Sequence, residues 1–208
     1  MIKLLVPSYN GMMLLETVSM IDTLIKAFPD IQPQQTLTGA SVATNRNILI
    51  TKLTLKKQEF DFSHVLFIDA DVYTAEPCKV FCDLLNANEM IASAVYPFRE
   101  YSEDSEGFYP CGNFEGSLPF VARSPLSATK KEYCDVGCLG FCLIKKEVFE
   151  KLEYPYFAEP AIDTGERAFV IGDDIYFFWK AKRAGFRCLV DFSNILSHQS
   201  IGGGHHVA

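Results

Sequence analysis

The sequence predicts a single α/β domain with a doubly wound, mostly parallel sheet flanked by helices. Segments with strand and helix patterns alternate through residues 1–97 of the 208-residue chain, as expected for strands joined by crossover helices. The uninterrupted apolar run at 65–68 suits a strand that is buried on both faces of a sheet. A chain of this length also fits one domain with a single substantial core.

The first half of the chain is expected to consist of alternating strands and helices. In order, we expect a strand at 2–7, a helix over 14–28 closed by Pro29, a strand at 35–39, a helix from 44 to 57 capped by Thr44, a strand at 65–68, a helix at 77–86 and a strand at 90–97. The helices show apolar residues three and four positions apart, and the strands are short apolar runs.

The second half is less regular. Residues 99–130 are rich in Gly, Pro, Ser and aromatic residues, which indicates a functional loop or a small hairpin. A strand at 138–144 and a helix at 145–152 are followed by a second irregular segment at 153–171. An amphipathic helix then begins after Gly172-Asp173-Asp174 and ends at Gly185, and a strand is expected at 187–190.

Composition narrows the classes of function. The chain has 19 Lys and Arg against 26 Asp and Glu, a net charge of -7, which argues against binding to nucleic acid or to an anionic membrane. The apolar stretch at 2–6 is too short for a signal peptide or a membrane span, so we expect a cytoplasmic protein. Seven cysteines favour buried free thiols, with a zinc site at Cys134, Cys138 and Cys142 as the weaker alternative.

Asp69 and Asp71 are the first candidate site residues, because they follow the apolar run at 65–68 directly. Ligands of open α/β sheets bind beyond the carboxyl ends of such strands. In an extended chain, residues two apart point to the same side, so both carboxylates would converge on one hard cation or, through it, on a polyphosphate. A solvated turn at the end of a strand is the alternative.

Short motifs occur in an order that resembles the nucleotide-sugar-dependent glycosyltransferases of the GT-A fold. They are Val6-Pro7-Ser8-Tyr9-Asn10, Arg46-Asn47 at the start of a helix, Asp69-Ala70-Asp71, the apolar segment 137–149, Gly172-Asp173-Asp174 before an aromatic helix, and the distal His198. The resemblance covers nearly the whole chain. It implies a compact, single-domain GT-A enzyme of viral or bacterial type, with a donor half at about 1–98 and an acceptor half, containing a smaller sheet or loop region, at about 99–201. The Gly-rich tail at 202–208 is either a flexible end or a linker to a further domain.

The resemblance implies transfer of a sugar from a nucleoside-diphosphate sugar, with UDP the commonest nucleotide, to a hydroxyl of a glycan or another acceptor. A divalent metal, Mn²⁺ or Mg²⁺, would neutralise the diphosphate leaving group, and an imidazole ligand favours Mn²⁺. By resemblance, Asp71 and His198 ligate the metal, and Asp69 contacts the ribose or the water shell of the metal.

The remaining motifs have implied roles as well. Pro7, Ser8 and Tyr9 would line the pocket for the base and ribose, and Asn10 and Ala70 belong to the same nucleotide-binding motifs. Arg46 would pair with phosphate oxygens. On the acceptor side, Asp174 or Asp173 would take a proton from the attacking hydroxyl in an inverting enzyme, or stabilise the donor in a retaining one.

Other interpretations stay open at this point. A phosphatase similar to the haloacid dehalogenase superfamily also uses an apolar strand followed by Asp-x-Asp, with Asp69 as nucleophile and a late Gly-Asp-Asp holding magnesium. A nucleotide or carbohydrate binder without catalysis is a third possibility. Among single residues, His198 is also compatible with a polar position on a loop at a strand end, Arg46 with a solvated helix position, and Asp173 or Asp174 with a helix N-cap.

Overall fold

The computed structural model describes residues 1–8, 11–35, 40–55, 62–97, 108–115, 120–125, 130–163, 165 and 168–199. The elements are β1 (Ile2–Val6), α1 (Leu15–Ala27), β2 (Ile31–Gln35), α2 (Val42–Leu55), β3 (His64–Ile68), β4 (Val72–Tyr73), α3 (Pro77–Ala87), β5 (Ile91–Val95), β6 (Phe108–Glu115), β7 (Phe120–Pro125), β8 (Lys131–Cys134), β9 (Phe141–Lys145), α4 (Lys146–Lys151), β10 (Ala161–Asp163), β11 (Ala168–Val170), α5 (Asp173–Arg183), β12 (Cys188–Ile195) and β13 (Ser197–His198).

A seven-stranded sheet forms the centre of the molecule, in the order β2-β1-β3-β9-β5-β12-β8. β1 pairs in parallel with β2 and β3, and β12 pairs in parallel with β5. β9 is antiparallel to both of its neighbours, and β8 is antiparallel to β12 at one edge. The prediction of a mostly parallel α/β sheet is confirmed, and the two antiparallel strands make it a mixed sheet.

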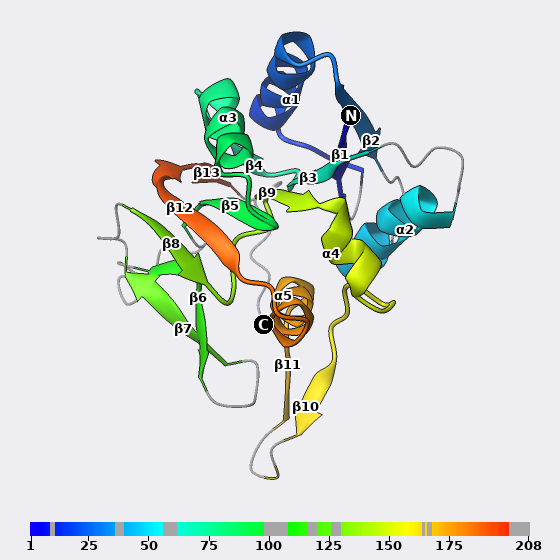
Figure 1. Cartoon of the computed structure of the whole chain (residues 1–208), viewed down its shortest axis with the longest axis vertical. Helices are drawn as coiled ribbons and strands as arrows, with labels where there is room; N and C mark the ends of the chain where they lie inside the picture. Colours follow the sequence, from blue (N-terminus) through cyan, green and yellow to red (C-terminus); the bar gives the residue numbers. More distant parts are fainter. Residues whose placement is uncertain are drawn as a thin grey trace.

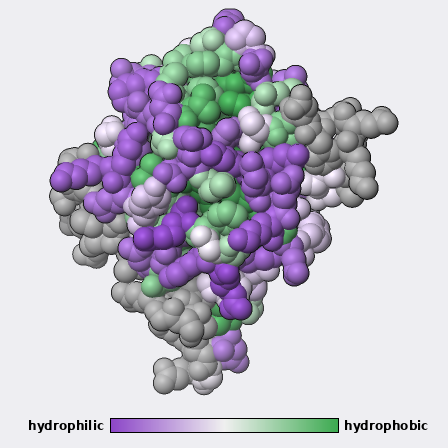
Figure 2. All heavy atoms as spheres, viewed as in Figure 1, coloured by the Kyte–Doolittle hydropathy of each residue, from purple (hydrophilic) through white to green (hydrophobic). Residues whose placement is uncertain are grey.

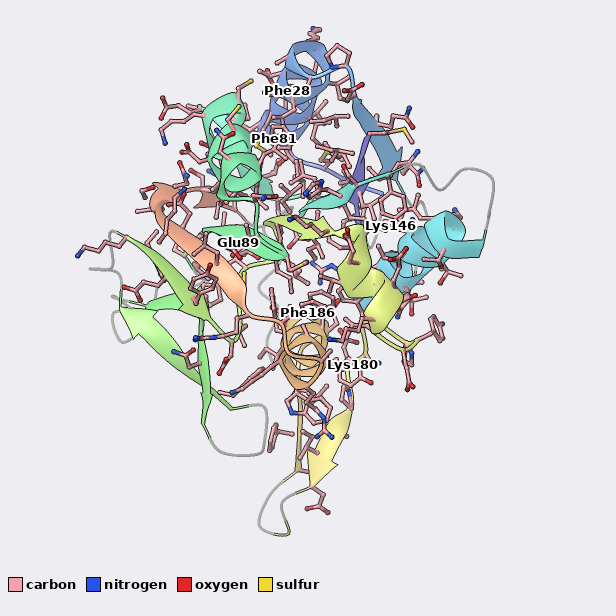
Figure 3. The ribbon with its side chains drawn as sticks, in the orientation of Figure 1. Phe28, Phe81, Glu89, Lys146, Lys180 and Phe186 are labelled. Carbon is pink, nitrogen blue, oxygen red and sulfur yellow. The ribbon has the colours of Figure 1, made fainter. Side chains whose placement is uncertain are left out.

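The helices cover both faces of this sheet. Figure 1 shows α1 and α3 side by side on one face and α2, α4 and α5 on the other. The rings of Phe28 and Phe81 meet between α1 and α3, with centroids 4.8 Å apart (Figure 3). On the opposite face, the rings of Phe157 and Phe177 stack at 5.0 Å, and Phe67 of β3 packs edge-on against Phe157.

Two element positions differ from those expected in the first half. The second strand lies at Ile31–Gln35 and not at 35–39, of which 36–39 lie outside the described residues. Pro33 is tolerated there because β2 is an edge strand, which needs only one set of ladder hydrogen bonds. Helix α2 begins at Val42, and the N–H of Thr44 donates to the Ser41 hydroxyl at 3.2 Å, so Ser41 and not Thr44 is the N-cap.

The second half contains more strands than expected. A hairpin of β6 and β7 confirms the prediction for the Gly- and aromatic-rich segment. A second hairpin, β10–β11, lies in the segment that was expected to be irregular and projects from the body in Figure 1. β8 was not predicted. Gly185 follows α5 with φ of 90°, as expected for the residue after a helix C-cap.

The surface viewed in Figure 2 is mostly hydrophilic, and hydrophobic side chains gather over α1 and α3 at its top. Within the described ranges, none of the helices combines the length and the apolar character needed to cross a bilayer. All seven cysteines are free thiols, and five of them are buried.

Candidate active site

A tight turn follows β3 and separates the two carboxylates of the Asp-x-Asp motif. The N–H of Val72 donates to the carbonyl of Asp69 at 3.3 Å, which closes a four-residue β-turn. The expectation that Asp69 and Asp71 lie on one side of an extended chain is therefore wrong. The turn directs Asp69 toward α2 and Asp71 toward the C-terminal part of the chain.

Asp71 faces His198 across this end of the sheet. β13 pairs antiparallel with β4, so that His198 lies opposite Val72, and the N–H of Gln199 donates to the Asp71 carbonyl at 3.0 Å. This ladder leaves His198 Nε2 3.7 Å from Asp71 Oδ1, with both side chains largely buried. The other ring nitrogen, Nδ1, donates to the carbonyl of Pro97 at 3.0 Å, since a carbonyl can only accept.

The His198 ring is also held from the side. Tyr96 packs against it at a centroid distance of 4.7 Å, and the phenol oxygen accepts the N–H of Gly140 at 3.0 Å. Burial raises the pKa of Tyr96 well above its ordinary value, so the phenol stays neutral. The carbonyl of Gly140 in turn accepts a hydrogen bond from the N–H of Asp69 at 3.1 Å. Gly140 therefore connects Tyr96, which packs against His198, to the Asp-x-Asp turn.

Arg46 lies at the centre of the second carboxylate group. Its Nη2 is 2.7 Å from Asp69 Oδ1, and its Nη1 is 2.7 Å from Asp173 Oδ2. The guanidinium lies beside the packed rings of Phe67 and Phe157, at 6.0 and 5.8 Å from their centroids. Burial alone lowers the pKa of Arg46, but the adjacent carboxylates outweigh burial and raise the pKa above its usual value, so the cation persists.

The first turn of α5 supplies the other two predicted carboxylates. Gly172 is the N-cap, so Asp173 and Asp174 are helix residues and neither is the cap. Asp173 is bound by Arg46, whereas Asp174 Oδ1 accepts the N–H of Ile175 at 2.7 Å. Burial and the charge of Asp173 raise the pKa of Asp174 above its ordinary value, and Arg46 opposes this rise.

The turn after β1 packs against the Asp-x-Asp turn. The Ser8 hydroxyl is buried and donates to the Met12 carbonyl at 3.1 Å, and Pro7 beside it is buried as well. The N–H of Leu14 donates to the carbonyl of Ala70 at 2.9 Å, which joins the two turns. Tyr9 and Asn10 lie outside the described residues.

Four supporting residues were not assigned a role from the sequence. Asn45 donates from Nδ2 to the Ser8 carbonyl at 2.8 Å, and Tyr96 and Gly140 orient His198. Asn47 accepts the N–H groups of Tyr156 and Phe157 and donates to the Phe157 carbonyl, all within 3.1 Å. Asn45 and Asn47 could have been found in the sequence because they lie on either side of Arg46. Gly140 could have been found because it belongs to the apolar 137–149 motif.

The structure contains a pocket that none of the predicted site residues line. It has a volume of about 270 Å³ and lies against α2, where Thr44, Asn47, Thr51 and Tyr154 contribute to its walls. The carboxylates, Arg46 and His198 are elsewhere. We therefore place the candidate site at the turn after β3, where the chemical groups converge.

Comparison with solved structures identifies the fold. A197 from STIV aligns with a TM-score of 0.54 and 21% identity, over 100% of this chain and 98% of that chain. GalNAc-T7, crystallised with UDP, GalNAc and Mn²⁺, aligns with a TM-score of 0.51 and 15% identity, over 97% of this chain and 38% of that chain. The chain has a GT-A-like fold. No protein-family model matches the sequence, and no curated protein matches it.

Proposed function

We propose that this protein is a metal-dependent glycosyltransferase that moves a sugar from a nucleoside-diphosphate sugar, with UDP as the nucleotide, to a hydroxyl of a glycan or another acceptor. The observation that carries the proposal is the facing pair of Asp71 and His198 at the carboxyl end of β3. Ligands of open α/β sheets bind at this edge. The GT-A-like fold supports the proposal, because the motifs that resemble those of glycosyltransferases occupy this edge.

The arrangement of Asp71 and His198 suits a divalent cation. When Nδ1 carries the single ring proton, the lone pair at Nε2 faces a carboxylate oxygen of Asp71, so both atoms are placed to bind one ion. Metal bonds to such atoms are about 2.0 to 2.2 Å long, so two ligands of one ion lie within about 4.3 Å of each other. The observed 3.7 Å meets this condition. The hydrogen bond from Nδ1 to a carbonyl is the support that metal-bound histidines usually have.

Manganese or magnesium held there would neutralise the negative charge that develops on the diphosphate when the sugar leaves. Among the described residues, no three His, Cys, Asp or Glu side chains form a metal-binding group, and this includes Cys134, Cys138 and Cys142. Among the described residues, Asp71 and His198 would bind the ion, and phosphate oxygens and water would occupy further positions, as is usual at nucleotide sites.

The acceptor side is assigned to Asp174 in preference to Asp173. Asp173 is bound by the Arg46 guanidinium at 2.7 Å, whereas the Asp174 carboxyl has no cation within salt-bridge distance in the described ranges. A carboxyl whose pKa is raised is a better base toward a hydroxyl. Ionised Asp174 would accept the proton of the attacking hydroxyl in an inverting reaction, or stabilise positive charge on the sugar in a retaining one.

We assign donor binding to the turn after β1 and the turn after β3, which pack against each other. Pro7, Ser8 and Ala70, with Tyr9 and Asn10 of the same motif, would bind the base and ribose, and Asp69 would contact the ribose. This assignment places the donor half at about 1–98 and the acceptor half at about 99–201. The GalNAc-T7 neighbour was crystallised with UDP, GalNAc and Mn²⁺, which supports the choice of UDP and manganese as the first ligands to test.

Thermal unfolding with a panel of nucleoside diphosphates, with and without MnCl₂, tests the proposal. A ligand present at 100 times its Kd stabilises the folded state by about 2.7 kcal/mol, which raises Tm by roughly 5 to 10 °C for a domain of this size. We expect stabilisation by UDP with manganese in the wild type and none in Asp71→Ala. Hydrolysis of a phosphomonoester with magnesium, without nucleotide binding, would support the phosphatase instead. Binding of UDP with no turnover of any UDP-sugar would support a non-catalytic binder.

A further inference from the structure

We infer that Arg46 is a positioning residue that couples the donor side of the site to the acceptor side, through simultaneous ion pairs with Asp69 and Asp173. This inference rests on the proposed function and goes beyond it, because it predicts that an acceptor-side carboxylate changes the affinity for the nucleotide. Arg46 extends from α2, Asp69 follows β3, and Asp173 begins α5. One side chain therefore connects three elements that are distant in sequence.

The geometry makes the two ion pairs dependent on each other. Nη1 and Nη2 belong to one planar guanidinium, and each donates to a different carboxylate at 2.7 Å. A planar group cannot rotate to follow one partner without moving its bond to the other. A change at Asp173 is therefore transmitted to Asp69 through a rigid group.

The surroundings hold this guanidinium in place. Its side chain is 5% exposed and lies against the packed rings of Phe67 and Phe157. The neighbouring residue, Asn47, makes three hydrogen bonds to the backbone of Tyr156 and Phe157, which fixes the second ring. Because these ion pairs are shielded from water, they are stronger than surface pairs, and loss of one partner has a large effect.

The direction of the coupling follows from charge. One cation is shared between two carboxylates at equal distances. If Asp173 loses its charge, Asp69 remains as the carboxylate that forms a direct ion pair with Arg46 among the described residues, and it is held more tightly. A carboxylate that is held more tightly by arginine is a weaker partner for ribose, so the affinity for UDP is expected to fall.

A double-mutant cycle on UDP binding tests the coupling. Isothermal titration calorimetry of UDP in MnCl₂ is performed on the wild type, Asp173→Asn, Arg46→Lys and the double variant. Arg46→Lys retains the positive charge and is expected to fold, but an ammonium lacks the planar two-branched geometry. We expect Asp173→Asn to weaken UDP binding at least fivefold in the wild-type background and less than twofold in the Arg46→Lys background.

A matched control separates coupling from loss of stability. Asp135 is a largely buried carboxylate that pairs with Lys182 at 2.6 Å, outside the candidate site. Asp135→Asn likewise neutralises a largely buried carboxylate, which also pairs with Arg187 at 3.5 Å, so it is expected to lower Tm as Asp173→Asn does and to leave UDP affinity within twofold of the wild type.

Each result has a definite consequence. Wild-type affinity for UDP in Asp173→Asn, or an equal loss in both Arg46 backgrounds, overturns the coupling and leaves the proposed function intact. A similar loss of affinity in Asp135→Asn also overturns it, because the loss would then be a general effect of destabilisation. If the wild type binds none of the nucleoside diphosphates with manganese, the proposed function fails and the coupling fails with it.

Discussion

His198 Nε2 lies 3.7 Å from Asp71 Oδ1. The two side chains meet where β13 pairs with β4, the short strand that follows the Asp-x-Asp turn. The imidazole is fixed at its other nitrogen by the Pro97 carbonyl and on its side by Tyr96. The pair is therefore oriented before any ligand arrives. Such preorganisation is what a site for a small hard cation requires.

Removing either member of this pair is expected to abolish manganese-dependent UDP binding. Asp71→Asn removes an anionic ligand and His198→Ala removes the imidazole, so each should weaken the affinity for UDP in MnCl₂ by at least tenfold, measured by calorimetry. His64→Ala is the control, because His64 lies at the start of β3, at the opposite end of the strand. Unchanged manganese dependence in His198→Ala would contradict the assignment of His198 as a ligand.

Gly140→Ala is expected to displace the Tyr96 ring that packs against His198, without changing Asp71 or His198 itself. A Cβ at this position would lie 2.6 Å from the Tyr96 ring and 2.9 Å from Val72 Cγ2, so the ring must move. We expect a loss of about 1 to 3 kcal/mol of stability and a drop of at least tenfold in manganese-dependent UDP affinity, measured by chemical denaturation and calorimetry.

Gly165→Ala is the matched control for this variant. Gly165 has φ of 80°, so alanine there is strained, but no atom of the described residues lies within 4 Å of the added Cβ. Gly165→Ala should lower the free energy of unfolding by about 1 kcal/mol or more and leave UDP affinity unchanged. Normal manganese-dependent binding in Gly140→Ala would show that the Tyr96 contact does not orient His198.

The sequence was sufficient to predict the fold because the signals for it are local. Apolar runs and helical periodicity indicate most of the elements, and the edge strand β2 was misplaced because Pro33 breaks the strand pattern where an edge tolerates it. The antiparallel β9 sits between β3 and β5 through pairing with strands far from it in the sequence. No local pattern indicates such an insertion.

For the candidate site, the sequence indicated residues but not the contacts that they make. The order of the motifs indicated Asp71, His198, Arg46 and Asp173, but their partners depend on long-range geometry. Extended geometry was expected at Asp69, and a β-turn closed by Val72 sends its side chain to Arg46 instead. The position of His198 depends on an irregularity in β12 after Asp191 and on the pairing of β13 with β4, which are tertiary features.

The backbone anchor at Asn47 is expected to contribute strongly to stability. Asn47→Ala removes three buried hydrogen bonds and leaves two N–H groups and a carbonyl of Tyr156 and Phe157 without that partner. The expected loss is about 2 to 4 kcal/mol in the free energy of unfolding, measured with urea. Asn86→Ala, on the exposed side of α3, is the control and should change stability by less than about 0.5 kcal/mol. Equal stability of the two variants would show that Asn47 does not anchor this segment.

The pH dependence of the site should follow Asp174. Burial and the neighbouring Asp173 raise the pKa of Asp174 above the ordinary value of 3.8, whereas hydrogen bonds from Lys79 and Asn194 lower the pKa of Asp83. Titration of the carboxyl carbons by NMR should therefore show Asp174 losing its proton at a higher pH than Asp83.

Because the proposed role requires ionised Asp174, UDP release from a UDP-sugar substrate should fall as the pH decreases through this raised pKa. Asp174→Asn should retain UDP binding in MnCl₂ and lose turnover at every pH. Turnover that persists in this variant, or an Asp174 that titrates below Asp83, would remove Asp174 from the acceptor side of the mechanism.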